Sequence, residues 1–380
     1  MDERVWASQI SDRIHQKETA VVKRNAHKIP YTTEAGVFDD WSDDDKVCWW
    51  TNGFWAGMLW QLYNVYHEVS YQTCAKEIED KLDKNLMNYM GMDHDSGFKW
   101  LLTSGANYQI NNDEKSKNRL MLAAGNLAGR INLKAGLIRA WNDPGNGDTA
   151  GWAIIDCMMN LPLLYNASAL TKDPRFTQIA MCHADNAMKV FMREDGSVNH
   201  IVTFDPDTGE FIRSLGGQGM QEGSSWTRGQ SWAVYGFTLS YHHTKKIEYL
   251  DTAIRSADYI LSKIPVSNLI PVDYDQPESC DWEDDTAAAI TACGLLLLSE
   301  ELGKAEGKDN DKAKKYYDKA VDLLKTLADS RCNWDPDTDQ LLERCSAAYN
   351  DDKHDFSIIY GDYFFTEAIL RLCGKEIFLW

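Results

Sequence analysis

The sequence predicts an all-α fold in which six helical hairpins close into a ring, with residues 1–380 forming a single domain. Three observations support this prediction. Apolar residues follow a helical period along most of the chain, and strand-like alternation is rare. A short motif, an aromatic or long residue followed four positions later by Ala, recurs at the spacing of one helix pair with its loops. Strongly apolar helices also alternate with amphipathic helices.

The amphipathic helices are expected to form the outer half of each hairpin. The first is predicted at about residues 4–24, and the repeated motif marks the others at Tyr71, Arg119, Phe176, Tyr249 and Tyr316. More apolar or small-residue helices, which must be buried, are predicted at 53–67, 96–109, 151–166, 226–242, 284–302 and 360–373. Because the last of these needs the helix at 4–24 as its partner, a closed ring is favoured over an open helical solenoid.

The most strand-like part of the chain is "GSVNHIVTFDPDTGE", residues 196–210. Its Asp-Pro and Thr-Gly pairs are typical of turns, so it predicts a minor β-hairpin that turns at Asp205 to Gly209. This hairpin would lie in a loop of the helical ring.

Composition indicates a folded, soluble protein with small partners. Hydrophobic residues make up 44% and charged residues 26%, and the formal net charge is −19, which disfavours a nucleic-acid or anionic-membrane binder. The start "MDERVWASQI" has no leader-like pattern, so the chain is expected to be cytoplasmic, or periplasmic if a leader has been removed. The nine cysteines include no CxxC pair and are expected to be free thiols.

The inner helices of such a ring run in one direction, so the segments at their N-terminal ends meet at one mouth. Nearly all of these segments combine an aromatic residue with a carboxylate, an amide or Arg: 48–55, 92–100, 146–152, 223–232, 280–288 and 358–365. Aromatic faces beside hydrogen-bonding groups suit a sugar ring. The alternative for any one Trp is that it fills a wide core.

One carboxylate stands out because "GWAIIDCMMNLPLLY", residues 151–165, is otherwise almost wholly apolar. On a helix, Trp152, Asp156 and Asn160 would form one stripe facing the cavity. Asp95, from the loop before an earlier inner helix, could approach Asp156 across the mouth. Desolvation and like charge would then keep one carboxyl group protonated, as a general acid.

Structural alternatives exist for both aspartates. Asp156 could pair with Arg228 in the core, and Asp95 could be the N-cap of a helix opening at Ser96. The acidic segments 40–46 and 335–343 lack EF-hand spacing, and "DWEDDTA" lacks a second metal motif. No nucleotide-binding motif appears either, so no metal or cofactor is expected.

Six segments together resemble the unsaturated glucuronyl hydrolases of glycoside hydrolase family 88. They are "WTNGFWAGMLW", "HDSGF", "IIDCMMNLPLLY", "GSSWTRGQSWAVYGF", "ITACGLL" and "YGDYFFTEAILRL", in the order of that family and across nearly the whole chain. The resemblance implies an (α/α)6 barrel, in agreement with the six hairpins. It also implies an exo-acting hydrolase of oligosaccharides, left by polysaccharide lyases, that end in a 4,5-unsaturated uronic acid.

The resemblance assigns roles to residues. An aspartate matching Asp156 protonates the vinyl ether and helps water to add, and Asp95 matches the second catalytic aspartate. Substrate contacts are implied at Trp50, Trp141, His200, Gln218, Arg228 and Trp232. The sequence departs from the family at Asn52, where the family has Asp, and the differing length before "HDSGF" makes Asp95 rather than Asp93 the choice.

Several alternatives stay open at this point. An unsaturated rhamnogalacturonyl hydrolase shares the barrel and the chemistry but acts on pectin-derived disaccharides. Sugar 2-epimerases use a similar barrel with paired histidines, and a non-catalytic sugar-binding barrel is a further class. The parent polymer, whether heparin, chondroitin, hyaluronan or another, is not specified, and a monomer or weak homodimer is expected. Lys353, His354 and Arg344 are candidates for a sulfate contact.

Overall fold

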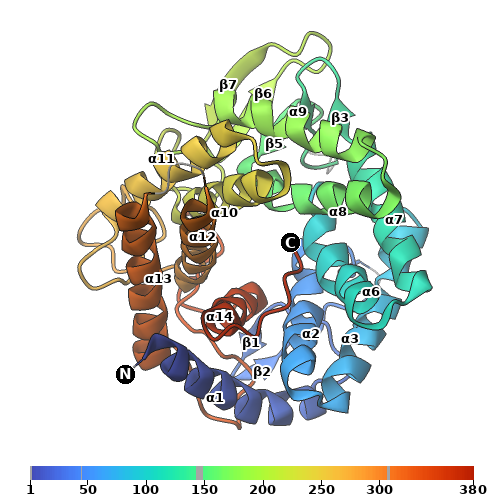
Figure 1. The fold of residues 1–380 in the computed structure, drawn as a ribbon, viewed down its shortest axis with the longest axis vertical. Coiled ribbons are helices and arrows are strands. Elements are labelled where there is room, and N and C mark those ends of the chain that lie inside the picture. Colours follow the sequence, from blue (N-terminus) through green and yellow to red (C-terminus); the bar gives the residue numbers. More distant parts are fainter. Residues whose placement is uncertain (1, 44, 143–148, 306–308) are drawn as a thin grey trace.

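The computed structural model describes residues 2–43, 45–142, 149–305 and 309–380. Within these residues, an inner ring of helices is surrounded by an outer ring (Figure 1). The inner ring contains α2 (Phe54–Tyr66), α5 (Ser96–Trp100) continued through the π-helical turn η2 (Leu101–Gly105) into α6 (Ala106–Asn111), α8 (Leu161–Thr171), α10 (Thr227–Thr244), α12 (Asp285–Lys304) and α14 (Ile359–Leu372). The outer ring contains α1 (Glu3–Arg24), α3 (Val69–Lys81), α7 (Glu114–Gly129), α9 (Arg175–Val190), α11 (Ile247–Lys263) and α13 (Asn310–Ser330). The predicted (α/α)6 barrel is confirmed.

Burial explains why the two rings differ in sequence. The outer helix α9 buries Phe176, Ala180 and Ala184, the repeated motif, while its opposite face meets solvent. The inner helix α12 is buried without interruption from Asp285 to Leu298. The ring closes where α1 packs against α14 and α3.

Helix α12 is also long and apolar enough to cross a membrane by length and composition alone. In the fold, 83% of its most apolar window is buried inside the protein. Its hydrophobicity is therefore that of a core helix, which needs apolar residues on every face.

The predicted β-hairpin is confirmed as β6 (Ile201–Phe204) and β7 (Phe211–Leu215), which pair antiparallel. The Asp205 carboxylate accepts hydrogen bonds from the backbone N–H groups of Asp207 and Thr208, and Gly209 takes a φ of +81° that suits glycine. A third strand, β5 (Trp152–Ile154), pairs with β6 and completes a small sheet. Short ribbons are formed by β1 (Thr33–Glu34) with β2 (Val37–Phe38) and by β3 (Ile131–Asn132) with β4 (Leu137–Ile138).

Strand β5 shows that the helix predicted at 151–166 is wrong over its first ten residues. The chain runs as β5, then as the 3₁₀ helix η3 (Ile155–Met159), and becomes α-helical only at Leu161. Two forces explain the change. Pairing with β6 satisfies the backbone of 152–154, and Pro162 suits the first turn of a helix but not its interior.

Candidate active site

A cavity of about 740 Å³ lies at the end of the ring where the inner helices begin. Trp50 precedes α2, Asp95 precedes α5, Asp156 lies on η3 before α8, and Arg228 and Tyr360 lie in the first turns of α10 and α14. The expected convergence of N-terminal ends therefore occurs. Of the eight predicted site residues, seven line this cavity: Asp95, Asp156, Trp50, Trp141, His200, Gln218 and Arg228. Residues 146–148 of one predicted mouth segment lie outside the described residues.

Asp156 presents a neutral acid to this cavity. Its side chain is only 15% exposed, and Oδ2 has no hydrogen-bond partner among the described residues. Burial, with a contribution from the charge of Asp95, raises the pKa of Asp156 to about 7. A carboxyl group that keeps its proton near neutral pH and lines a cavity can act as a general acid.

Asp95 is fixed by its neighbours rather than by capping a helix. It is the N-cap residue of α5, as the alternative expected, but its side chain makes no capping hydrogen bond, so capping does not account for its carboxylate. Its Oδ1 accepts a hydrogen bond from Asn160 Nδ2 at 3.1 Å, and its Oδ2 is 3.4 Å from His94 Nε2. Burial favours the neutral form of His94, but the charge and hydrogen bond of Asp95, together with Cys157, raise the pKa of that histidine well above its usual value. An ion pair of His94 and Asp95 therefore lies beside Asp156.

Asn160 connects the segments that carry the two aspartates. The side-chain amide, which is fully buried, donates to Asp95 Oδ1 and, at 3.3 Å, to the backbone carbonyl of Asp156. Its Oδ1 accepts the backbone N–H of Phe98 at 2.9 Å. The predicted stripe of Trp152, Asp156 and Asn160 on one helix is wrong, since Trp152 lies on β5. Asn160 nevertheless reaches the site, through its own hydrogen bonds.

His200 is a neutral hydrogen-bond donor in the cavity wall. Its Nδ1 accepts the backbone N–H of Gln218 at 3.0 Å, so the ring proton belongs on Nε2, which is 3.7 Å from Asp156 Oδ2. Burial, with the nearby Arg228, lowers the pKa of His200 to about 3. The sequence placed one histidine in this pocket, whereas the structure also brings His94 to its wall.

Arg228 pairs with Asp284 and not with Asp156, which corrects the core-pair alternative. Its Nη1 lies 2.5 Å from Asp284 Oδ2 and donates to the carbonyl of Ser346 at 2.6 Å. Its Nη2 donates to the carbonyl of Ala347, which also accepts Gln218 Nε2 at 2.9 Å. The guanidinium group thus brings positive charge to the wall of an acidic protein in a fixed orientation.

The predicted tryptophans divide between the cavity and the core. Trp50 and Trp141 line the cavity, and Trp141 is 38% exposed. Trp232 is fully buried and does not line it. It packs on Phe98 and Phe364, with ring centroids 5.3 and 5.5 Å away. The expected substrate contact of Trp232 is therefore corrected to a supporting place beneath the floor.

The departure at Asn52 has a structural reason. The side chain is fully buried, and its amide donates to the carbonyls of Lys46 and Val47, both at 3.0 Å. A carboxylate could not donate these bonds. Asn52 therefore holds the loop before α2 and takes no part in the cavity wall.

The candidate sulfate contacts lie outside the cavity. Arg344 is paired with Asp355 at 3.0 Å, and His354 is stacked on Trp282 with centroids 3.7 Å apart. Among the described residues, no group of three or more His, Cys, Asp and Glu side chains is arranged to hold a metal ion.

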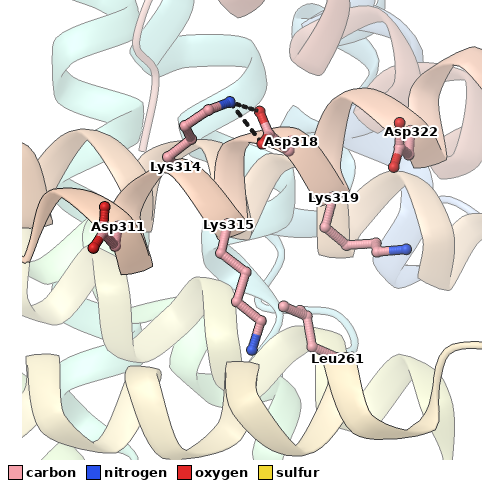
Figure 2. A pocket seen from close by; sticks show the side chains of 7 residues that line it. All are labelled: Leu261, Asp311, Lys314, Lys315, Asp318, Lys319 and Asp322. Atoms are coloured by element: carbon pink, nitrogen blue, oxygen red, sulfur yellow. Dashed lines mark hydrogen bonds and ion pairs between the residues drawn. The ribbon is translucent and has the colours of Figure 1, made fainter.

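A second hollow, of about 420 Å³, lies far from this chemistry, between the outer helices α11 and α13 (Figure 2). Its wall carries Leu261, three lysines and three aspartates. Lys314 Nζ binds both oxygens of Asp318 at 2.7 Å. A shallow groove of solvated charges without an aromatic surface offers little to a sugar ring.

Sequence reasoning missed Tyr31 and Trp41, which line the cavity, and it included Trp49, which also lines it, only as part of the mouth segment 48–55. They come from the segment between α1 and α2, where no helical or strand period marks a face. The signal available was the density of aromatic residues in "YTTEAGVFDDWSDDDKVCWW", of which only the last two were considered.

Comparison with known proteins agrees with this site. The model of Glycosyl Hydrolase Family 88 matches residues 13–267. The unsaturated glucuronyl hydrolase of Bacillus sp. (strain GL1) is 32% identical over 97% of both chains. The unsaturated chondroitin disaccharide hydrolase of Streptococcus pneumoniae (strain ATCC BAA-255 / R6) is 32% identical over 85% of this chain and 81% of that protein.

A solved structure of a UGL variant with dGlcA-Glc-Rha-Glc superposes with a TM-score of 0.87, at 31% identity and 96% coverage of each chain. The similarity thus covers nearly the whole barrel. On these matches, the chain belongs to glycosyl hydrolase family 88.

Proposed function

We propose that the protein is an unsaturated glucuronyl hydrolase. It releases the 4,5-unsaturated uronic acid from the non-reducing end of glycosaminoglycan oligosaccharides that a lyase has produced. The observation that carries the proposal is the Asp156 carboxyl group, whose pKa is raised to about 7 and which lines a cavity walled by aromatic rings. Membership of the family supports the substrate class.

The proposed reaction begins at the electron-rich double bond. Asp156 donates its proton to C4, and water adds to C5 while returning a proton to the Asp156 carboxylate. The C5 hemiketal opens to a ketone and leaves a hemiacetal at C1, which expels the neighbouring sugar. Atoms balance with one water consumed, and the acid is restored. The His94–Asp95 pair beside Asp156 keeps this proton available, because Asp95 raises and His94 lowers the pKa of Asp156.

We assign recognition of the uronate carboxylate to Arg228, with His200 beside it. Arg228 contributes the charge of its guanidinium group, and His200 lines the cavity beside Asp156. Trp50 and Trp141 supply faces for the sugar rings. Since all of these groups come from one chain, we propose that it acts as a monomer or weak homodimer.

The test is turnover of unsaturated disaccharides from chondroitin, hyaluronan and heparin, with and without sulfate. Loss of the ultraviolet absorbance of the C4=C5 bond reports the reaction, and released keto-acid confirms the product. Turnover of at least one glycosaminoglycan disaccharide is expected. If only the pectin-derived rhamnogalacturonyl disaccharide were turned over, the proposed substrate would be wrong. If the disaccharides bound without turnover, the protein would be a sugar-binding barrel and not an enzyme.

A further inference from the structure

A second aromatic surface lies in the cavity wall, apart from Trp50 and Trp141. Tyr31, Trp41 and Trp49 pack together, and we call them the aromatic platform. Ring centroids are 4.9 Å apart for Tyr31 and Trp41 and 5.2 Å apart for Trp41 and Trp49. All three residues line the cavity, and Trp49 is 39% exposed. The platform thus reaches from the cavity wall to solvent.

Hydrogen bonds fix the platform before any ligand arrives. The Asp39 carboxylate accepts the backbone N–H groups of Tyr31 and Thr32 through Oδ1, at 2.8 and 3.0 Å. Its Oδ2 accepts the indole N–H of Trp41 at 2.6 Å, and the backbone N–H of Trp41 binds the carbonyl of Ile29 at 2.7 Å. The polar edge of the Trp41 indole is therefore satisfied within the protein and does not need a ligand to bind it. A prepositioned ring costs little entropy when a ligand binds.

The platform also continues from the proposed catalytic part of the cavity. The carbonyl of Tyr31 accepts the backbone N–H of Ile359 at 3.0 Å, which places Tyr31 at the start of α14 beside Tyr360. The Arg228 guanidinium lies 5.4 Å from the ring centroid of Tyr360. The platform therefore begins near the group assigned to the uronate and extends away from it toward the exposed Trp49.

Polar side chains accompany the platform in a pattern that suits a sugar. Asp45, Lys46 and Asp351 line the same part of the wall, and Lys46 Nζ lies 5.3 Å from the ring centroid of Trp41. A sugar ring presents C–H faces to aromatic rings and hydroxyl groups to charged side chains. The cavity, of about 740 Å³, has room for more than one such ring, since pockets of roughly 300–1,000 Å³ hold drug-sized ligands.

We propose that the aromatic platform binds a sugar ring on the reducing-end side of the bond that is cleaved, beyond the first two rings of the substrate. The inference rests on the proposed function. An exo-acting enzyme holds the terminal unsaturated ring at Asp156, so every further ring of the chain lies toward the reducing end. The protein accordingly takes unsaturated oligosaccharides longer than a disaccharide in preference to the disaccharide itself.

The test compares an unsaturated disaccharide with an unsaturated tetrasaccharide of the same unsulfated polymer, hyaluronan. For the wild-type protein, KM for the tetrasaccharide is expected to be lower. Trp41→Ala and Trp49→Ala should each raise KM for the tetrasaccharide about 3- to 10-fold more than KM for the disaccharide, the scale of one lost aromatic contact. Trp6→Ala, on the outer helix α1 and outside the cavity, is the matched control and should leave the ratio of the two KM values as it is.

The outcomes separate this inference from the proposed function. If Trp41→Ala and Trp49→Ala raised KM equally for the two substrates, the platform would support the cavity as a whole, and the inference would be overturned. A tetrasaccharide that binds no better than the disaccharide would do the same. If the wild-type protein turned over neither substrate, the proposed function would instead be overturned. Trp49→Phe, which keeps an aromatic face at an exposed position, should retain most of the tetrasaccharide preference and so shows that loss in Trp49→Ala is not misfolding.

Discussion

Asp156 and Asp362 are chemically the same group in two different regions of the ring. Asp362 is buried and the side chain of Asp156 is 15% exposed, and desolvation raises the pKa of each to about 7. Asp362 lies on α14 near the junction with α1, and its two oxygens accept the backbone N–H groups of Leu342 and Leu341 at 2.6 and 3.1 Å. Asp156 lies at the mouth of the ring, and its Oδ2 has no partner among the described residues.

The difference shows that a shifted pKa does not by itself mark a catalytic group. Structural carboxyl groups such as Asp362 are shifted by the same desolvation. What distinguishes Asp156 is that it lines the cavity, and that its buried Oδ2 has no hydrogen-bond partner among the described residues. Both oxygens of Asp362 accept hydrogen bonds from the loop at 341–342, so this residue contributes to the stability of the fold.

The largest effect is expected from replacing the free acid. Asp156→Asn should lower kcat on the unsaturated disaccharide by at least about 100-fold, the scale of lost general acid catalysis, while KM changes little. Asp362→Asn is the matched control and should keep kcat within a small factor, since it does not line the cavity. Steady-state kinetics on both variants decide the matter. Comparable losses in both would mean that the comparison between the two carboxyl groups is wrong.

The Asp156→Asn change should lower activity but stabilise the fold relative to wild type as pH rises. A carboxyl group has a pKa of about 4 in the unfolded chain, and that of folded Asp156 is about 7. The folded state therefore holds the proton more tightly, so wild-type stability falls as pH rises between these values. Asn does not titrate. Between pH 5 and pH 8 the stability of Asp156→Asn relative to wild type should thus rise by about 3 kcal/mol.

Thermal unfolding at the two pH values measures this gain. The difference in Tm, variant minus wild type, should be more positive at pH 8 than at pH 5. A difference that is the same at both pH values would show that Asp156 does not carry the raised pKa in the folded protein.

The sequence was sufficient for the ring because its signal is local and repeated. Motifs such as Phe176-Ala180-Ala184 place one buried face on each outer helix, and helical period reports such a face directly. Strand β5 could not be found in this way. Its pairing with β6 joins residues about fifty positions apart, and the apolar residues of 151–160 fit a buried helix equally well. Pro162 was the available warning, since it opens α8.

The site was predictable where a residue's type is unusual for its setting. Asp156 in an apolar run met that condition, and so did Asp95 in the motif shared with the family. Trp232 was misplaced because it lies four residues after Arg228 on α10, one turn deeper into the ring. One turn further along, the same helix face packs on Phe98 beneath the cavity. A sequence pattern does not indicate how far along a helix the cavity ends and the core begins.

A smaller effect is expected at Asn160, which joins the two regions of the site without facing substrate. Asn160→Ala removes the hydrogen bonds to Asp95 and to the Asp156 carbonyl and should lower kcat about 10-fold, the scale of one buried bond to a charged group. KM should change less than kcat, because Asn160 does not line the cavity. Asn166→Ala is the matched control. Its amide donates to the Pro162 carbonyl, at 2.9 Å on the same helix, and the change should leave kcat unaltered.

The pH profile gives the finest comparison between the two carboxyl groups. A general acid works only while protonated, so kcat/KM should fall about tenfold per pH unit above the pKa of Asp156, near 7. The charge of Asp95 helps to raise that pKa. In Asp95→Asn, the residual kcat/KM should therefore begin to fall at a lower pH than in the wild-type protein. Asp362→Asn should leave the alkaline fall in place, although Asp362 has a pKa in the same range. If the alkaline fall of kcat/KM shifted in Asp362→Asn and not in Asp95→Asn, the proton donor of the reaction would be a group other than Asp156.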